Sequence, residues 1–259
     1  MLIFDFDGVL VDSIDEIAIT AYNAATDQMV FSLDAIPEHA WKLFRKNRFH
    51  VQSIGDTLPL MRWFLKEGRP DPHRVLSPGE YQRILEQENT PLSDRVGLFF
   101  LTRKIFIEKN EEGWISLNAP FQPIWDELKR FSGEIVLLTN KNKEATIRLC
   151  RRFGLRLQEP DVYSGDRGRS KIENLNRIHR RFDRAPYEFV DDSLKNLREL
   201  DIHFNRDRFP QNHSGRPFLK PILAGWGYVG PEDEKGARAL RYPVFTQEDL
   251  IELLHRRRI

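Results

Sequence analysis

Acidic, hydroxyl and amide side chains follow directly on three short apolar runs of this sequence. Each run is long enough for a buried strand, and the polar residues come where that strand would end. They are Asp5 and Asp7 after Leu2–Phe4, Thr139 and Asn140 after Glu134–Leu138, and Asp191 and Asp192 after Tyr187–Val190. In a parallel α/β sheet, ligands bind beyond the carboxyl ends of the strands. We therefore expect these side chains to meet at one edge of a sheet.

Four of these residues are carboxylates, which would repel one another at a common edge unless a hard cation neutralised them. They are Asp5, Asp7, Asp191 and Asp192. Carboxylate oxygens with few other protein ligands suit Mg²⁺, which keeps several waters and binds a substrate phosphate. The residue types therefore predict a magnesium site that also handles a phosphate group.

The elements that must position these side chains are strands alternating with helices. A fourth apolar run, Pro221–Ala224, joins the three above, and short runs of this kind are typical of buried parallel strands. One-sided helical periodicity covers residues 121–131, 143–153, 171–182, 194–200 and 247–254. This alternation predicts an α/β fold with a doubly wound parallel sheet, covered by helices on both faces.

A long stretch after the first strand has a different character. It shows helical periodicity without comparable strand runs, and prolines at 37, 59, 70, 72, 78 and 91 divide it into short helices. We expect an α/β core domain of residues 1–14 and 118–259, and a mostly helical domain of residues 15–117. The segment 201–220 is too long for an ordinary helix-to-strand connection, and whether it is a loop or an added element stays open.

The bulk composition narrows the class of partner. Forty basic and 39 acidic residues give a net charge of +1, which makes nucleic acid an unlikely partner. The single cysteine, Cys150, excludes an intramolecular disulfide. The sequence shows no signal peptide and no apolar run long enough to cross a bilayer, so we expect a cytoplasmic protein with no membrane partner.

The run Leu2-Ile3-Phe4-Asp5-Phe6-Asp7-Gly8-Val9-Leu10-Val11-Asp12-Ser13 resembles the first signature of the haloacid dehalogenase superfamily. More narrowly, it is similar to the branch that holds phosphoglycolate phosphatases and β-phosphoglucomutases. Three further motifs follow in the order of that family: Thr139 closes a strand, Lys171 opens a helix, and Asp191-Asp192 close a strand. The resemblance implies a Rossmann-like core, with the helical insert at the position of a type-one cap.

The resemblance also implies a Mg²⁺-dependent phosphatase that hydrolyses a small phosphorylated metabolite through an aspartyl-phosphate. Asp5 would be the nucleophile, and Asp7 would protonate the leaving oxygen and then activate water. The hydroxyl of Thr139 and the backbone N–H of Asn140 would bind the phosphoryl oxygens. Lys171 would counter the charge that develops in the transition state.

For the metal, the resemblance implies Asp5, the backbone carbonyl of Asp7 and Asp192 as ligands, with Asp191 as a further ligand or a support. Many relatives carry a second aspartate a few positions later in this motif, where the present sequence has Asn196. The adjacent pair must then supply the acidic function. We favour Asp192 as the direct ligand.

Several simpler interpretations stay open. Lys171 is also typical of the exposed start of a helix with Ser170 as its cap, and Arg167 or Arg169 is an alternative cation. Asp191-Asp192 could merely cap the next helix. A phosphomutase of the same fold and a non-catalytic binding protein are the alternative functions, and the sequence does not indicate an oligomeric state.

Two regions are further candidates for contacts with substrate. Polar residues of the insert are candidates for binding an anionic substrate: Arg45, Lys46, Arg48, His50, Gln52 and Arg62. The turn Gly225-Trp226-Gly227-Tyr228 is similar to turns that line the site in phosphoglycolate phosphatases. A purely structural turn explains it equally well.

Overall fold

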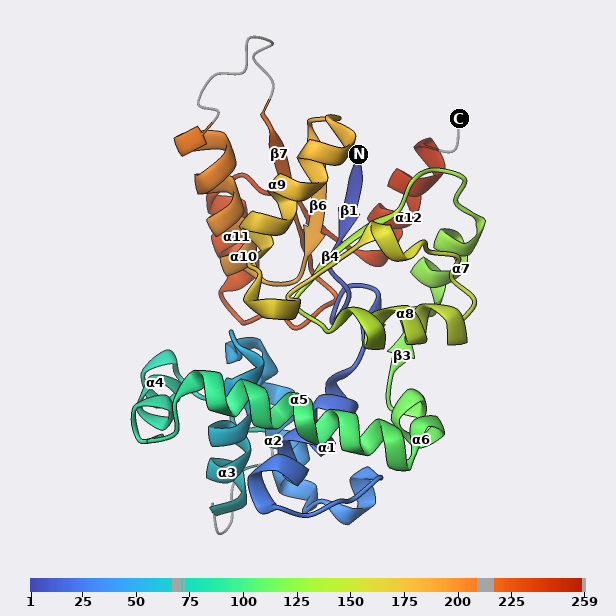
Figure 1. Cartoon of the computed structure of the whole chain (residues 1–259). Coiled ribbons are helices and arrows are strands. Elements are labelled where there is room, and N and C mark those ends of the chain that lie inside the picture. Colours follow the sequence, from blue (N-terminus) through green and yellow to red (C-terminus); the bar gives the residue numbers. More distant parts are fainter. Residues whose placement is uncertain (67–70, 72, 209–216, 258–259) are drawn as a thin grey trace. The chain divides into compact units, whose positions relative to one another are not determined.

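The computed structural model describes residues 1–66, 71, 73–208 and 217–257. The chain forms two compact units, one made of Met1–Asp12 and Ala119–Ile259, the other of Ser13–Asn118 (Figure 1). The first unit contains the sheet and the second is built from helices. Each is described by itself below.

The first unit is built on a six-stranded sheet with the order β5-β4-β1-β6-β7-β8, in which every neighbouring pair is parallel. The strands are β1 Leu2–Phe4, β4 Val136–Thr139, β5 Val162–Ser164, β6 Tyr187–Asp191, β7 Leu219–Ala224 and β8 Val244–Phe245. Ile3 at the centre pairs with Val136 on one side and Phe189 on the other. Strands buried on both faces need such continuous apolar runs. The predicted α/β fold with a parallel sheet is confirmed.

Helices cover both faces of this sheet. They are α7 Gln122–Arg130, α8 Lys143–Arg152, α9 Lys171–Phe182, α10 Leu194–Asp201, α11 Asp233–Ala239 and α12 Gln247–Arg256. In Figure 1, α9, α10 and α11 lie on one side of the sheet, and α7 and α12 lie on the other. Leu175 of α9 and Leu197 of α10 join Ile3 and Phe189 in one buried cluster, which fixes these helices against the strands.

Two edge strands, β5 and β8, and a small antiparallel pair were not predicted. In that pair, β2 Val11–Asp12 lies against β3 Ala119–Pro120. Each of these strands has two or three residues, so pairing with a neighbour creates it rather than a local sequence signal. Of the segment 201–220, Ile202–Arg208 forms a π-helix that continues α10, and residues 209–216 lie outside the described residues.

The second unit has a helical core of its own. Its helices are α1 Ile14–Thr26, α2 Glu38–Asn47, α3 Thr57–Lys66, α4 Pro78–Glu86, α5 Leu92–Lys109 and α6 Glu111–Ser116. Phe44 and Phe64 are fully buried, and Glu16 pairs with Arg103 at 2.7 Å inside the unit. Predicted breaks at Pro37, Pro78 and Pro91 stand at helix starts, where a missing N–H costs nothing. The break predicted at Pro59 is wrong, because this residue lies in the first turn of α3, where a backbone N–H has no partner within the helix. Pro70 and Pro72 lie outside the described residues. Across the described part of the chain, no helix is both long and apolar enough to cross a membrane.

Candidate active site

Asp5 stands directly after the central strand β1. Its backbone N–H donates to the carbonyl of Val190 at 2.9 Å, which keeps the residue in line with β6. The backbone N–H of Phe6 donates to its Oδ1 at 2.7 Å, and the whole residue is 8% exposed. The carboxylate is therefore held at the carboxyl end of the sheet with restricted access to water.

The chain leaves β1 through a tight loop that depends on Gly8. The N–H groups of Leu10 and Val11 both donate to the carbonyl of Phe6, at 2.9 and 3.1 Å. Gly8 has φ +82°, and a Cβ there would lie 2.0 Å from Oδ2 of Asp192. A side chain at this position would meet both a strained backbone and a collision, so only glycine fits.

Lys171 contacts two of the carboxylates, those of Asp5 and Asp191. It is the first residue of α9, whose start is fixed by a capping box between Ser170 and Glu173. Its Nζ lies 2.5 Å from Oδ2 of Asp191 and 3.0 Å from Oδ2 of Asp5. Burial by itself lowers the pKa of this ammonium group, but Asp191 and Asp5 outweigh that effect and raise it above its usual value. Lys171 is therefore charged at neutral pH.

The same environment makes Asp5 an unusual carboxyl group. Burial raises the pKa of Asp5 to about 6; Lys171 opposes this effect, and the nearby Asp191 adds to it. A cation bound beside Asp5 would favour its ionised form and lower this pKa. The site thus favours the ionised form of Asp5 when a positive charge is present.

Asp191 and Asp192, at the end of β6, differ in what they contact. Asp191 accepts from Ser193 N–H at 2.9 Å through Oδ1, and from Lys171 and Asn196 through Oδ2 at 2.5 and 3.1 Å. Asp192 accepts from the backbone N–H of Tyr228 at 2.8 Å through Oδ2. One carboxylate oxygen each of Asp5, Asp191 and Asp192 lie within 4.8 Å of one another, a grouping that can hold a metal ion.

Thr139 and Asn140, predicted for the site at the end of β4, are followed by Lys141, which the sequence analysis did not single out. Thr139 is buried and its Oγ1 accepts from the N–H of Lys141 at 3.1 Å, whereas Asn140 between them is exposed. The Lys141 side chain is fully buried, and its Nζ lies 3.0 Å from Oδ1 of Asp7. A lysine two residues beyond a strand is a weak signal, because only the fold places it against Asp7.

The structure also places the remaining candidates. Ser170 caps α9 as considered above, but Lys171 beside it is buried against Asp5 and Asp191 rather than exposed. The helix after β6 is capped by Ser193, not by the aspartates. Within the insert, Arg45 pairs with Asp15 at 2.7 Å and Arg62 with Glu88 at 2.6 Å, so both contribute to contacts inside their own unit. Lys46 and Gln52 are exposed, whereas His50 contacts the carbonyl of Leu76 and Arg48 that of Val51.

Comparison with known proteins bears on the fold. No family model matches the sequence, and no curated protein matches it. Among solved structures, the chain is similar to a predicted phosphatase from Clostridium acetobutylicum, with a TM-score of 0.58 at 14% identity, over 98% of this chain and 97% of that one.

Two further structures are similar over most of their length. A predicted phosphoglycolate phosphatase from Haemophilus somnus has a TM-score of 0.56 at 15% identity, covering 98% of this chain and 96% of that one. A hydrolase of the haloacid dehalogenase-like family from Streptococcus pneumoniae has a TM-score of 0.51 at 15% identity, with the same coverage. The resemblance inferred from the four motifs is thus confirmed at the level of the whole architecture: this chain has the fold of the haloacid dehalogenase-like hydrolases.

Proposed function

We propose that the protein is a Mg²⁺-dependent phosphatase that hydrolyses a small phosphomonoester through an aspartyl-phosphate on Asp5. The observation that carries this proposal is the contact of one buried lysine, Lys171, with both Asp5 and Asp191, beside Asp192. A buried nucleophile, a fixed cation and a group of metal-binding oxygens at one strand edge are the parts that phosphoryl transfer requires. The fold shared with solved phosphatases supports the same conclusion.

Charge balance favours a divalent cation. Four carboxylates, on Asp5, Asp7, Asp191 and Asp192, face two ammonium groups, on Lys141 and Lys171. With all four carboxylates ionised, the six side chains carry a net charge of −2, which one Mg²⁺ neutralises; Asp7 holds a proton only at the stage where it acts as the acid. Oxygen ligands and a nearby phosphate group suit Mg²⁺ better than softer metals. When bound, Mg²⁺ would neutralise the phosphate group and help to polarise it.

The division of labour between the two aspartates of β6 follows from their contacts. Both oxygens of Asp191 accept hydrogen bonds from Ser193, Lys171 and Asn196, so we assign Asp191 to holding Lys171 in place. Asp192 accepts from the backbone N–H of Tyr228 at Oδ2 and offers a carboxylate oxygen to the same group as Asp5, so we assign it as the direct ligand with Asp5. The backbone carbonyl of Asp7 completes the proposed set.

The proposed reaction has two steps. In the first, an oxygen of Asp5 forms a bond to phosphorus, the bond from phosphorus to the substrate oxygen breaks, and Asp7 gives that oxygen a proton. In the second, Asp7 takes a proton from a water molecule whose oxygen attacks phosphorus, and the Asp5–phosphorus bond breaks to release phosphate. Lys171 and Thr139 would stabilise the phosphoryl oxygens in both steps.

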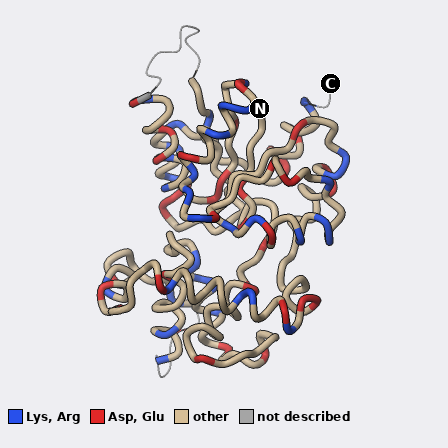
Figure 2. Tube along the Cα trace, viewed as in Figure 1, with Lys and Arg blue, Asp and Glu red and all other residues tan. Residues whose placement is uncertain are grey.

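We further propose that the helical unit Ser13–Asn118 acts as a cap that selects the substrate. It follows the first motif directly, at the position of such caps in proteins of this fold. Lys and Arg are interspersed with Asp and Glu along both units in Figure 2, and the net charge is +1, which favours a small metabolite over a nucleic-acid partner.

The test is phosphate release from p-nitrophenyl phosphate with and without Mg²⁺. Wild-type protein should be active only with Mg²⁺, and Asp5→Asn should lose at least about 10³-fold in kcat. Asp34→Asn, an exposed aspartate of the other unit, should behave as wild type. Equal activity in Asp5→Asn and wild type would rule out Asp5 as the nucleophile.

A second experiment, in ¹⁸O-labelled water, separates a phosphatase from a phosphomutase. Hydrolysis places the label in the released phosphate, whereas a phosphomutase moves phosphate between positions of its substrate.

A further inference from the structure

The turn that leaves β7, Gly225–Tyr228, contacts both Asp192 and the segment 9–12 after β1. The backbone N–H of Tyr228 donates to Oδ2 of Asp192 at 2.8 Å. Its hydroxyl donates to Oδ1 of Asp12 at 2.9 Å, and the indole N–H of Trp226 donates to the carbonyl of Val9 at 3.0 Å. The turn thus bonds to Asp192 by its backbone and to the segment 9–12 by its two aromatic side chains.

Gly227 permits this close approach. A Cβ at Gly227 would lie 2.4 Å from Cβ of Asp192 and 2.5 Å from the carbonyl oxygen of Gly8. From the other side, a Cβ at Gly8 would lie 2.0 Å from Oδ2 of Asp192. Asp192 is therefore packed between two glycines, with no room for a side chain at either. Its carboxylate is restricted in direction by contact as well as by the hydrogen bond from Tyr228.

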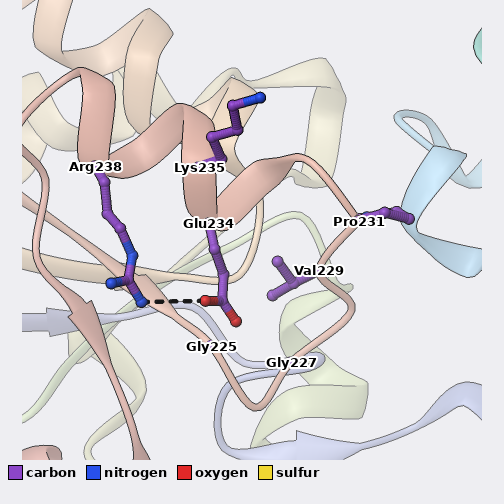
Figure 3. Close-up of a pocket in the computed structure, with 8 residues that line it drawn as sticks. Gly225, Gly227, Val229, Pro231, Glu234, Lys235 and Arg238 are labelled. Atoms are coloured by element: carbon purple, nitrogen blue, oxygen red, sulfur yellow. Dashed lines mark hydrogen bonds and ion pairs between the residues drawn. The ribbon is translucent and has the colours of Figure 1, made fainter.

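The outer side of the turn is open. A surface pocket of about 590 Å³ is bordered by Gly225 and Gly227 of the turn, by Val229 after it, and by Glu234 and Arg238 of α11 (Figure 3). Glu234 and Arg238 form an exposed ion pair at 3.3 Å, a kind of contact that contributes little to stability. The N–H of Gly225 donates to the carbonyl of Phe245 on β8 at 2.9 Å, which holds the start of the turn. The contacts toward Asp192, Val9 and Asp12 hold its later part.

We propose that Gly227 and Tyr228, in the second half of this turn, position the metal ligand Asp192, an inference that rests on the function proposed above. Gly227 and the N–H of Tyr228 fix the direction of the Asp192 carboxylate, and the Tyr228 hydroxyl anchors the turn through Asp12. Groups that orient metal ligands typically change metal affinity by about 10- to 100-fold when they are removed. Beyond joining β7 to α11, the turn would therefore raise the affinity of the site for the metal.

The closing experiment is Mg²⁺ binding by calorimetry to the full chain, with the unfolding temperature measured on the same samples. Gly227→Ala should weaken Mg²⁺ binding at least about tenfold. Gly225→Ala is the matched control from the same turn: its Cβ would meet Phe245 O at 3.1 Å and Val244 at 3.2 Å, on β8. It should lower the unfolding temperature while the dissociation constant stays within about twofold of wild type.

Tyr228→Phe keeps the N–H to Asp192 and removes the hydroxyl that donates to Asp12. It should weaken Mg²⁺ binding by about three- to tenfold, and it answers the question if Gly227→Ala does not fold. Wild-type affinity in both Gly227→Ala and Tyr228→Phe, or an equal loss in Gly225→Ala, would overturn the inference and leave the proposed function standing. Wild-type protein that binds no Mg²⁺ would instead overturn the proposed function.

Discussion

Lys141 is the side chain through which the proposed acid–base step can be tested most directly. It is buried, and its ammonium group contacts the carboxylate of Asp7 at 3.0 Å. Lys141→Met should keep the apolar stem and remove this charge, and with it one contact that orients the Asp7 carboxyl group toward the leaving oxygen. We expect kcat to fall by about 10- to 100-fold and KM to change little, as measured by steady-state kinetics with p-nitrophenyl phosphate.

The matched control is Lys143→Met, two residues further along the chain. Lys143 is partly exposed and lies 3.7 Å from Glu159, an ion pair of small expected value. The kcat of Lys143→Met should stay within about twofold of wild type. A wild-type kcat in Lys141→Met would show that Asp7 does not depend on this contact.

Asp5 leads to a prediction on stability rather than on rate. In the metal-free protein its pKa is raised to about 6 by burial, and to a smaller extent by Asp191, against the opposing effect of Lys171. Above the ordinary pKa of an aspartate the unfolded chain releases this proton, whereas the folded chain keeps it until about pH 6. The unfolded state therefore binds fewer protons in this window, so stability falls as pH rises through it and stays reduced above it.

Asp5→Asn removes that penalty. In the presence of a chelator, the variant should be more stable than wild type at pH 7, by up to about 3 kcal/mol for a shift of two pKa units, and the difference should vanish near pH 4. Urea unfolding between pH 4 and 8 measures this. A variant that is less stable than wild type at pH 7 would show that the ion pair with Lys171 outweighs the burial of the carboxylate.

At the scale of elements, the interior strands could be predicted and the edges could not. β1, β4, β6 and β7 are buried on both faces, so each requires an apolar run that is visible in the sequence. The edge strands β5 and β8 have three and two residues, and pairing alone defines them. Their existence depends on neighbours that the sequence does not reveal.

The residues of the candidate site likewise fall into those that the sequence predicts and those that depend on long-range contacts. Asp5, Thr139 and Asp192 come at strand ends, where their position follows from the order of the elements. Lys141 contacts Asp7, 134 positions away in the chain, and no local pattern encodes that contact. Tyr228 belongs to a turn that the sequence did single out, but its contact with Asp192, 36 positions away, could not be predicted. The catalytic and metal-binding roles of all these residues remain predictions that the experiments above address.

The start of α9 connects an element to the chemistry, because its first residue is Lys171. Ser170 accepts from the N–H of Glu173 at 3.2 Å, and Glu173 accepts from the N–H of Ser170 at 2.8 Å. Ser170→Ala should destabilise the protein by about 1 kcal/mol and loosen the first turn. We expect kcat to fall by about three- to tenfold, since Lys171 then spends less time against Asp5.

Thr246→Ala is the control for that variant. Thr246 and Asp249 form the same capping box at the start of α12, which carries none of the proposed site residues. Its loss of stability in urea unfolding should be similar, and its kcat should match that of wild type. Equal losses of kcat in the two variants would show that α9 affects activity only through overall stability.

At the scale of the whole molecule, the insert enters and leaves the sheet unit at neighbouring points. β2 and β3 are antiparallel, with Asp12 opposite Ala119 and Val11 opposite Pro120. Opposed residues of an antiparallel pair lie about 5 Å apart, so a short turn can join them. All the side chains of the proposed catalytic and metal sites belong to this unit, which has its own buried core. The insert Ser13–Asn118 can therefore be deleted, and the two ends that it leaves can be joined without rearranging the sheet unit.

Joining Asp12 to Ala119 through Asn-Gly should consequently give a unit that folds by itself. With all proposed ligands retained, Mg²⁺ at about 100 times its dissociation constant should stabilise it by about 2.7 kcal/mol, as thermal or urea unfolding would measure. The same variant with Asp192→Asn should lose this stabilisation. The isolated unit with Asp192 intact should still hydrolyse p-nitrophenyl phosphate. Its rates on the members of a panel of phosphorylated metabolites should become similar to one another, because the proposed cap is gone. A folded unit that keeps the selectivity of the full chain would place substrate recognition in the sheet unit and contradict the role proposed for the insert.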